Sequence, residues 1–205
     1  MLRFFKGDPL RHGGVGVLPG AFNPVTNAHI ALAKASIEQY RLDQIVFLLP
    51  EVFPHKAYIG ASFEERLALL KAALSGEPRC AIASSDRGLF IEIAHAVRDD
   101  YGPGADIYLI CGRDAAERIV NWDYGDGPDF AEQLRQFQML VGSRGAGYDI
   151  PARYQGRIHC VELPLWLSEV SATEVRQAVI RSEAWEHLVP AAVANEIVKR
   201  KLYVT

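Results

Sequence analysis

The sequence predicts a doubly wound α/β fold built on a mostly parallel β-sheet. Short apolar runs alternate with helix-period stretches along the chain, a rhythm typical of parallel β-α units. One run, Gln44–Pro50, is uninterruptedly apolar from Ile45 to Leu49, as expected for a strand buried on both faces. These observations indicate a Rossmann-like sheet, in which ligands bind at the carboxyl ends of the strands.

The first predicted elements are a strand at Val15–Pro19, a tight turn at Gly20–Pro24 and a helix at Asn27–Tyr40. Ser62 and Glu65 have capping-box spacing and open a helix that runs through Leu74. The other predicted strands are Gln44–Pro50, Arg79–Ser84, Asp106–Cys111 and Gln138–Gly142. The other predicted helices are Ile91–Arg98, Asp114–Val120, Asp129–Arg135, Ser171–Arg181 and Pro190–Lys201.

No repeat or low-complexity linker divides the chain, so we expect one domain over residues 1–205, with 171–205 forming a helical C-terminal part. In such a sheet the ligand-binding loops are those that follow the strands. The loops expected to matter most are those after Pro19, Pro50, Cys111 and Gly142.

Composition excludes several classes of protein. The chain has 205 residues, of which 49% are hydrophobic and 23% charged, which is typical of a globular protein and excludes a disordered one. A net charge of −3 does not favour a nucleic-acid surface, and no apolar run approaches the roughly 20 residues of a membrane span. The three cysteines are scattered within apolar stretches, which indicates buried, reduced thiols and a cytoplasmic protein.

Two familiar nucleotide motifs do not fit. Gly14-Val-Gly16-Val-Leu-Pro-Gly20 has the look of a dinucleotide fingerprint, but its first glycines precede or enter the strand instead of following it. The sequence also has no P-loop, no serine nucleophile elbow and no His-Glu metal spacing. A dehydrogenase or a P-loop kinase is therefore disfavoured.

A better candidate begins where the first strand ends, in the segment Gly20–His29. The glycine and proline of this segment set a tight turn, and Thr26 and His29 then stand at the start of the following helix. Free backbone N–H groups and the positive end of the helix dipole meet there, which makes a phosphate site. A lone histidine at a helix start is more often a capping or solvated residue, but the strand-turn-helix context favours a functional one.

A second candidate lies at Val170–Arg176. Ser171 and Glu174 have capping-box spacing, Ser171 and Thr173 bring hydroxyl groups to another helix start, and Arg176 follows within two turns. An arginine can hold phosphate oxygens with two donors at once. Alone this segment would be a capped surface helix. Two hydroxyl-and-cation helix starts in one small α/β chain favour a nucleotide site.

The two motifs together resemble those of the nucleotidylyltransferase superfamily, (H/T)-x-G-H and I-S-S-T-x-I-R. Pro54-His55-Lys56, Glu65-Arg66-Leu67 and Gly112-Arg-Asp114 are similar to segments of bacterial nicotinate-mononucleotide adenylyltransferases. Trp122 stands where that family has a substrate-side tryptophan, and the likeness continues through Val141–Arg144 to the C-terminal helices. The resemblance covers nearly the whole chain and implies the same doubly wound fold.

The resemblance implies adenylyl transfer from ATP to a phosphomonoester, nicotinate mononucleotide, with release of pyrophosphate. Such chemistry requires positioning and charge neutralisation and no covalent nucleophile. The resemblance implies that Thr26, His29, Lys56 and Arg176 act at the reacting phosphates. The residues that it places around the nucleotide are Gly20, Ala21, Phe22, Gly112, Asp114, Ser171 and Thr173. Trp122 and Arg144 are implied on the acceptor side. Mg²⁺ is expected to arrive with ATP, because no dedicated carboxylate cage is visible. The expected partners are ATP and a small phosphomonoester, and no nucleic acid or membrane is expected. The sequence does not decide whether the protein forms a homo-oligomer.

Four departures from the family pattern keep alternatives open. Asn23 stands where Asp is common, Ala28 replaces a glycine, Ala172 replaces a serine, and Phe90–Ala94 replaces a Tyr-Thr-rich segment on the pyridine-nucleotide side. One alternative is adenylyl or cytidylyl transfer to another acceptor such as phosphopantetheine, since the first motif is closer to those enzymes. The other alternative is a non-catalytic nucleotide-binding protein of the same fold.

Overall fold

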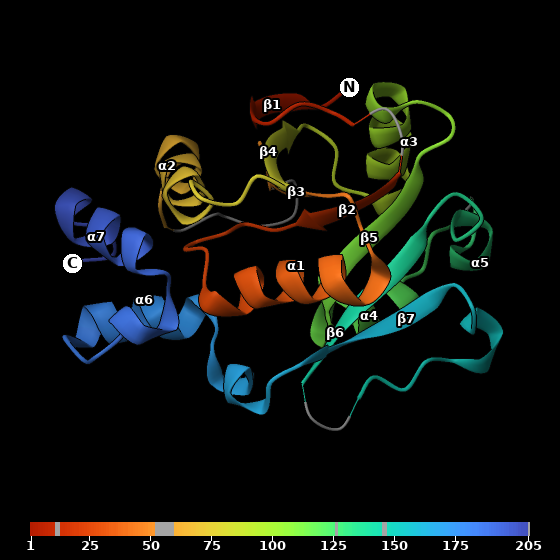
Figure 1. Cartoon of the computed structure of the whole chain (residues 1–205). Helices are drawn as coiled ribbons and strands as arrows, with labels where there is room; N and C mark the ends of the chain where they lie inside the picture. The colour runs from red at the N-terminus through yellow and green to blue at the C-terminus, as the bar shows by residue number, and fades with distance from the viewer. Residues whose placement is uncertain (11–12, 52–59, 126, 145–146, 205) are drawn as a thin grey trace.

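The structure, a computed structural model, describes residues 1–10, 13–51, 60–125, 127–144 and 147–204. These residues form one seven-stranded sheet flanked by helices (Figure 1). The strands are β1 (Arg3–Lys6), β2 (Gly14–Pro19), β3 (Gln44–Pro50), β4 (Cys80–Ser85), β5 (Asp106–Gly112), β6 (Gln138–Arg144) and β7 (Ile158–Leu163). The α-helices are α1 (Asn27–Tyr40), α2 (Phe63–Ala73), α3 (Phe90–Tyr101), α4 (Arg113–Val120), α5 (Phe130–Gln133), α6 (Ala172–Arg181) and α7 (Ala191–Arg200). Short 3-10 helices are η1 (Ala152–Tyr154), η2 (Leu165–Glu169) and η3 (Glu186–Leu188).

The strand order confirms the predicted doubly wound topology. The order is β1-β4-β3-β2-β5-β6-β7, and every neighbouring pair is parallel except β1 with β4. The chain moves outward from β2 through β3 to β4 and then returns to the other side of β2 with β5. The strand order therefore reverses between β2 and β5, and the crevice outside their carboxyl ends is where such sheets bind ligands.

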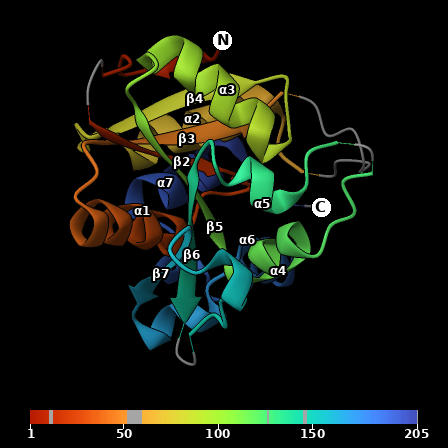
Figure 2. The same ribbon diagram turned by 90° about the vertical axis from the view of Figure 1, so that its right-hand side faces the viewer.

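Side chains of the central strands alternate between two hydrophobic cores, one on each face of the sheet. In β3, Ile45, Phe47 and Leu49 enter the core beneath α1, α2, α6 and α7, whereas Val46 and Leu48 enter the core beneath α3, α4 and α5. Figure 2 shows α1 on one side of the sheet and α4 and α5 on the other. This double burial explains the continuous apolar run in the sequence.

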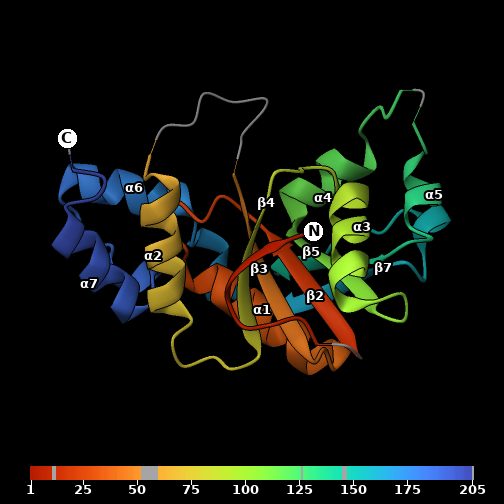
Figure 3. The same ribbon diagram turned by 90° about the horizontal axis from the view of Figure 1, so that it is seen from above.

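The C-terminal helices complete the first core. Helix α7 packs beside α2, and the two lie side by side when the molecule is seen from above (Figure 3). The capping box that predicted the start of α2 is formed: Glu65 N–H donates to Ser62 Oγ (3.2 Å), and Ser62 N–H donates to Glu65 Oε2 (2.7 Å). In the described part of the chain no helix is long and apolar enough to cross a membrane.

The structure differs from the sequence-based expectations at the edges of the sheet. The edge strands β1 and β7 were not predicted, because each is only partly buried and so lacks a long apolar run. Helix α3 extends three residues beyond the predicted end at Arg98, because Tyr101 (3% exposed) completes its buried stripe. Helix α5 is shorter than predicted, since the chain after it continues in i→i−3 bonds such as Gln136 N–H to Gln133 O.

Gly16 and the cysteines have plain structural explanations. A Cβ atom on Gly16 would lie 2.4 Å from Ile45 Cδ1, so the lack of a side chain here allows β2 to pack against its neighbours. The three thiols are free, as predicted. The expectation of full burial holds for Cys80 and Cys111 and is wrong for Cys160, which is half-buried on the outer strand β7.

Candidate active site

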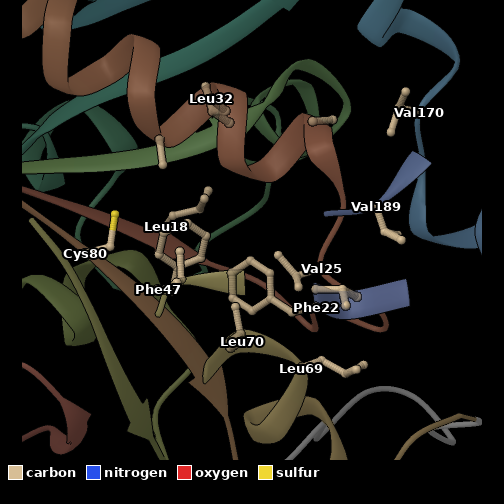
Figure 4. Close-up of a cluster of buried hydrophobic side chains, with 14 of the residues drawn as sticks. Leu18, Phe22, Val25, Leu32, Phe47, Leu69, Leu70, Cys80, Val170 and Val189 are labelled. Carbon is tan, nitrogen blue, oxygen red and sulfur yellow. The ribbon is translucent and has the colours of Figure 1, made fainter. Parts of the chain in front are cut away.

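The turn that follows β2, residues Gly20–Thr26, is here called the nucleotide turn. Phe22 anchors it, because its left-handed backbone (φ 47°) directs a side chain only 2% exposed onto the ring of Phe47, 5.4 Å between centroids. Figure 4 shows Phe22 and Val25 of the turn among the core side chains. A Cβ atom on Gly20 would lie 3.0 Å from the Phe22 ring, so a larger residue there would require this ring to shift by a few tenths of an ångström. Any contact of Phe22 with a nucleotide must come from its main chain.

His29 is held at the start of α1 by Thr26. The Thr26 backbone N–H donates to His29 Nδ1 (3.1 Å), and Thr26 Oγ1 lies 2.8 Å from the same nitrogen. Because a peptide N–H can only donate, Nδ1 is an acceptor and the proton of the neutral ring lies on Nε2. Thr26 is fully buried, and the edge-on Phe22 ring, 5.2 Å away, restrains the imidazole from a second side. The arrangement prepares a single Nε2–H donor.

A cavity of about 250 Å³ opens at the point where the strand order reverses. Its walls come from the end of β2, the start of α1, the ends of β5, β6 and β7, and the start of α6. The lining residues are Leu18, Pro19, Ala28, His29, Leu32, Cys111, Gly112, Ala115, Gly142, Leu163, Val170, Ser171 and Ala172. The structure thus brings together three residues that the sequence singled out from distant segments, His29, Gly112 and Ser171. Of the four connections predicted to matter, those after Pro19 and Cys111 lead into cavity-lining residues at the starts of α1 and α4. The connection after Gly142 adds no lining residue beyond Gly142 itself.

Helix α6 is joined to the nucleotide turn by Arg176. Its Nη1 donates to the carbonyl oxygen of Asn23 (2.6 Å) and to that of Ala172 (3.1 Å), while Nη2 donates to Thr173 Oγ1 (3.3 Å). The two sequence motifs are therefore in direct contact. In this arrangement Nη1 is committed to carbonyl groups, so Arg176 positions the turn as well as bringing positive charge to it.

The start of α6 is capped by Ser171, whose Oγ accepts a hydrogen bond from Glu174 N–H (3.1 Å). Only this half of the expected capping box is formed, because the Glu174 carboxylate pairs with Arg181 instead (3.5 Å). Ser171 and Thr173 are both exposed. Their hydroxyl groups stand at the positive end of the helix dipole, where an anion is favoured.

Asp114 and Trp122 lie outside this cavity. Both line an adjoining open hollow of about 720 Å³ along α4. Trp122 also borders a smaller hollow of about 220 Å³ with the start of α3 and Tyr124. Its side chain is 60% exposed, which removes the alternative that it is a core residue.

Two predicted residues cannot be placed in full. Lys56, with the rest of Pro54-His55-Lys56, lies outside the described residues. Arg144 ends β6, two residues after the cavity-lining Gly142, and only its main chain is described. Ala21 is placed by its carbonyl oxygen, which accepts a hydrogen bond from Arg66 Nη1 (2.9 Å).

Sequence reasoning missed several residues of the site. Cys111 lines the cavity, and burial raises the pKa of its thiol to about 12, so the thiol stays protonated at neutral pH. Leu163 lines the cavity from β7, a strand that was not predicted. Arg66 could have been found from spacing, because it shares a helical stripe with Leu69 and Leu70 and so falls on the buried face.

Ala28 and the acidic residues complete the description. The Ala28 methyl group, 5% exposed, occupies part of the cavity wall where the resemblance has a glycine. Within the described ranges no group of three or more His, Cys, Asp or Glu side chains is arranged to hold a metal ion.

Comparison with known proteins agrees with this geometry. Residues 17–178, which include the nucleotide turn and most of α6, match the cytidylyltransferase-like family. The chain belongs to this family. It is similar to proteins named probable nicotinate-nucleotide adenylyltransferase from Moorella thermoacetica (28% identity, 94% of this chain and 93% of the relative) and Gloeobacter violaceus (30% identity, 92% and 95%).

A solved relative has the same fold. The Plasmodium falciparum nicotinic acid mononucleotide adenylyltransferase complexed with NaAD aligns with a TM-score of 0.73 at 17% identity, covering 94% of this chain and 98% of the other. A likeness at this identity shows the fold. Cytidylyltransferase-like membership makes the cavity at the strand reversal the candidate active site of a nucleotidyltransferase.

Proposed function

We propose that this protein transfers the adenylyl group of Mg-ATP to nicotinate mononucleotide and releases pyrophosphate. The names of curated relatives that match over nearly their full length support this acceptor. In the reaction an acceptor phosphate oxygen forms a bond to the α-phosphorus of ATP, and the bond from that phosphorus to the β-bridging oxygen breaks. The products are a dinucleotide and pyrophosphate. Because the acceptor attacks ATP directly, no covalent enzyme intermediate is needed.

The observation that carries the proposal is the joining of two helix starts at one cavity. His29 at the start of α1 and Ser171 at the start of α6 line the same space, although 142 positions separate them in the sequence. Each helix start has a positive dipole end and N–H groups that precede the i→i−4 bonding of the helix. A triphosphate is the ligand that such a pair of anion sites suits best.

The chain's own groups divide the work along the triphosphate. His29 donates from Nε2–H to the α-phosphate, where negative charge accumulates as the acceptor attacks. Ser171, Thr173 and the α6 start hold the β- and γ-phosphates, which leave as pyrophosphate, and Arg176 brings a charge that is never lost. Lys56 approaches the acceptor phosphate, and Gly112 with Asp114 borders the adenosine. Mg²⁺ enters as part of the ATP complex and neutralises phosphate charge.

The acceptor side fits a flat aromatic ring. The hollow of about 220 Å³ is lined by Gly88, Leu89, Phe90, Arg118, Ile119, Trp122 and Tyr124. The exposed Trp122 can stack on a pyridine base, and Arg118 is the cation in its wall. Arg144 is proposed on the same acceptor side.

The start of α3 predicts weak selection of the acceptor's carboxylate. Leu89 N–H, which faces this helix start, already donates to Glu92 Oε2 (3.2 Å). Because this N–H is already occupied and the Glu92 carboxylate repels a second negative charge, the site does not favour the carboxylate of the acceptor. We therefore expect a preference for nicotinate over nicotinamide that is small compared with sites built on dedicated hydrogen bonds.

The Ala28 methyl group on the cavity wall favours a second candidate, a protein that binds nucleotide without turnover. One experiment separates the candidates: Mg-ATP is incubated with nicotinate mononucleotide, nicotinamide mononucleotide or phosphopantetheine while pyrophosphate is measured. The proposal expects release with a pyridine mononucleotide and the fastest release with the nicotinate form. Faster release with phosphopantetheine overturns the acceptor, and ATP binding without release from any acceptor favours the binding protein. The proposed setting is the cytoplasm, a compartment that suits three free thiols.

A further inference from the structure

Arg66 is a buried cation beneath the nucleotide turn. It is 2% exposed and shares the buried face of α2 with Leu69 and Leu70. A charged group is costly to bury unless its donors are hydrogen-bonded. A guanidinium on the apolar stripe of a helix therefore needs a specific set of acceptors, and the identity of those acceptors indicates what it does.

Two of the acceptors of Arg66 are carbonyl groups, one on each side of the nucleotide site. Nη1 of Arg66 donates to the carbonyl oxygen of Ala21 in the nucleotide turn (2.9 Å), and Nη2 donates to that of Pro50 at the end of β3 (3.4 Å). The same two segments meet directly, since Gly20 N–H donates to Leu48 O (3.1 Å). Arg66 thus fastens the nucleotide turn to the strand end that precedes the segment carrying Lys56.

The residues just before α2 add a second tie to the turn. Ala61 N–H donates to the Asn23 side-chain oxygen (3.2 Å). The Asn23 amide lies so close to Gly60 that a Cβ atom there would be 2.1 Å from its nitrogen. From the other side, Arg176 donates to the Asn23 carbonyl (2.6 Å). The turn is therefore held between α2 and α6.

The geometry of these ties suits a phosphate site. An anion is attracted by peptide N–H groups and repelled by carbonyl oxygens. Two carbonyl groups of the turn, those of Ala21 and Asn23, are engaged by guanidinium groups, and neither Ala21 nor Arg66 lines the cavity. Both carbonyl dipoles are thereby compensated and fixed by guanidinium groups.

We propose that Arg66 is a positioning residue that holds the nucleotide turn in its phosphate-binding shape by fixing the Ala21 carbonyl. It touches no reacting atom in this scheme. The kinetic part of the inference rests on the proposed adenylyl transfer, whereas the structural part does not. Release of the Ala21 carbonyl lets the turn rotate its peptide groups, and misplacement of a reacting group by about 1 Å can cost about 100-fold in rate.

The test compares three variants of the full chain. Arg66→Met keeps the bulk and removes the donors, and Arg66→Lys keeps the charge with a single donor group. Leu69→Ala is the matched control, because Leu69 is fully buried in the same helix and its side chain has no hydrogen-bond donor for the Ala21 carbonyl. Two readouts are taken at a temperature where every variant is folded: kcat with Mg-ATP and nicotinate mononucleotide, and hydrogen exchange of the amides in residues 20–26.

We expect Arg66→Met to lower kcat about 100-fold and to speed exchange across residues 20–26, with Arg66→Lys between it and the parent. Leu69→Ala should lower the melting temperature and leave kcat and that exchange near the parent's values. If Leu69→Ala loses as much kcat as Arg66→Met at equal stability, Arg66 is only structural and the proposal is overturned. Should Arg66→Met fail to fold, Arg66→Lys against Leu69→Ala decides by the same comparison. If the parent releases no pyrophosphate, the proposed adenylyl transfer is wrong, and hydrogen exchange alone then tests the role of Arg66. Unchanged exchange of residues 20–26 in Arg66→Met would overturn that role.

Discussion

The contact between Thr26 and His29 yields a prediction in which activity and stability separate. Thr26→Val keeps the size of the side chain and removes the hydroxyl group, whose oxygen lies 2.8 Å from His29 Nδ1. The imidazole keeps its backbone donor, the Thr26 N–H at 3.1 Å, so no buried acceptor is left unpaired. A hydrogen bond of this kind contributes about 0.5–1.5 kcal/mol, which corresponds to about a two- to tenfold loss of kcat.

Thr26→Ser is the matched control. It keeps the hydroxyl group and deletes a methyl group from a fully buried site, which costs about 1 kcal/mol of unfolding free energy. The valine variant should therefore lose kcat about two- to tenfold, whereas the serine variant, at a comparable loss of unfolding free energy of about 1 kcal/mol, should keep the parent's kcat. The assays are pyrophosphate release at saturating substrates and urea unfolding. The reasoning is refuted if Thr26→Val turns over at the parent's rate, or if both variants lose kcat in proportion to stability.

Four further predictions follow from the described contacts. The lysine of Arg176→Lys cannot make the forked contacts to Asn23 O and Ala172 O, so steady-state kinetics should show kcat/KM for ATP lower by about tenfold or more. Kinetics equal to the parent's would mean that the start of α6 is an ordinary capped helix without a role in ATP binding. Ala28→Gly removes a methyl group from the cavity wall and should lower KM for ATP. Because glycine destabilises a helix, the unfolding free energy should fall by about 0.5–1 kcal/mol. An unchanged KM would contradict this prediction. The ratio of kcat/KM for nicotinate over nicotinamide mononucleotide should stay well below about 10⁴, and a larger ratio refutes the weak-selection argument. Burial raises the pKa of Cys80 to about 11 from an unfolded value near 9, so the contribution of its neutral thiol to stability is complete below pH 9 and is lost as pH rises toward 11. Over that pH range the melting temperature of Cys80→Ala should therefore fall less steeply than the parent's, and parallel curves would contradict this.

Much of the fold follows from local patterns in the sequence. The run Gln44–Pro50 is β3 with the predicted bounds, because burial on both faces leaves a continuous apolar signature. Helix α1 also has its predicted bounds, set by the turn before it and by the chain reversal at Arg41. The half-buried edge strands β1 and β7 carry no such pattern, since their partners are set by tertiary packing alone.

The candidate site was predictable where chemistry and position coincide. His29 and Ser171 stand at helix starts, which sequence spacing identifies, and the structure brings both to one cavity. The use of Arg176 on the Asn23 carbonyl could not be foreseen, because it depends on how α6 meets a turn about 150 positions earlier. Phe22 was expected near the nucleotide, but its left-handed backbone turns its ring into the core instead.

The most direct test of the central claim is kcat for pyrophosphate release by His29→Ala with Mg-ATP and nicotinate mononucleotide. His29 is held as a preorganised donor on the cavity wall, and loss of one such donor to a developing charge typically lowers the rate by about 10²–10³. The exposed His95 on α3 provides the control, and His95→Ala should match the parent. The account predicts a fall of that size in kcat with a smaller change in KM for ATP, because the contact strengthens as charge develops. A folded His29→Ala variant that keeps the parent's kcat would contradict the assignment of this cavity as the site of adenylyl transfer.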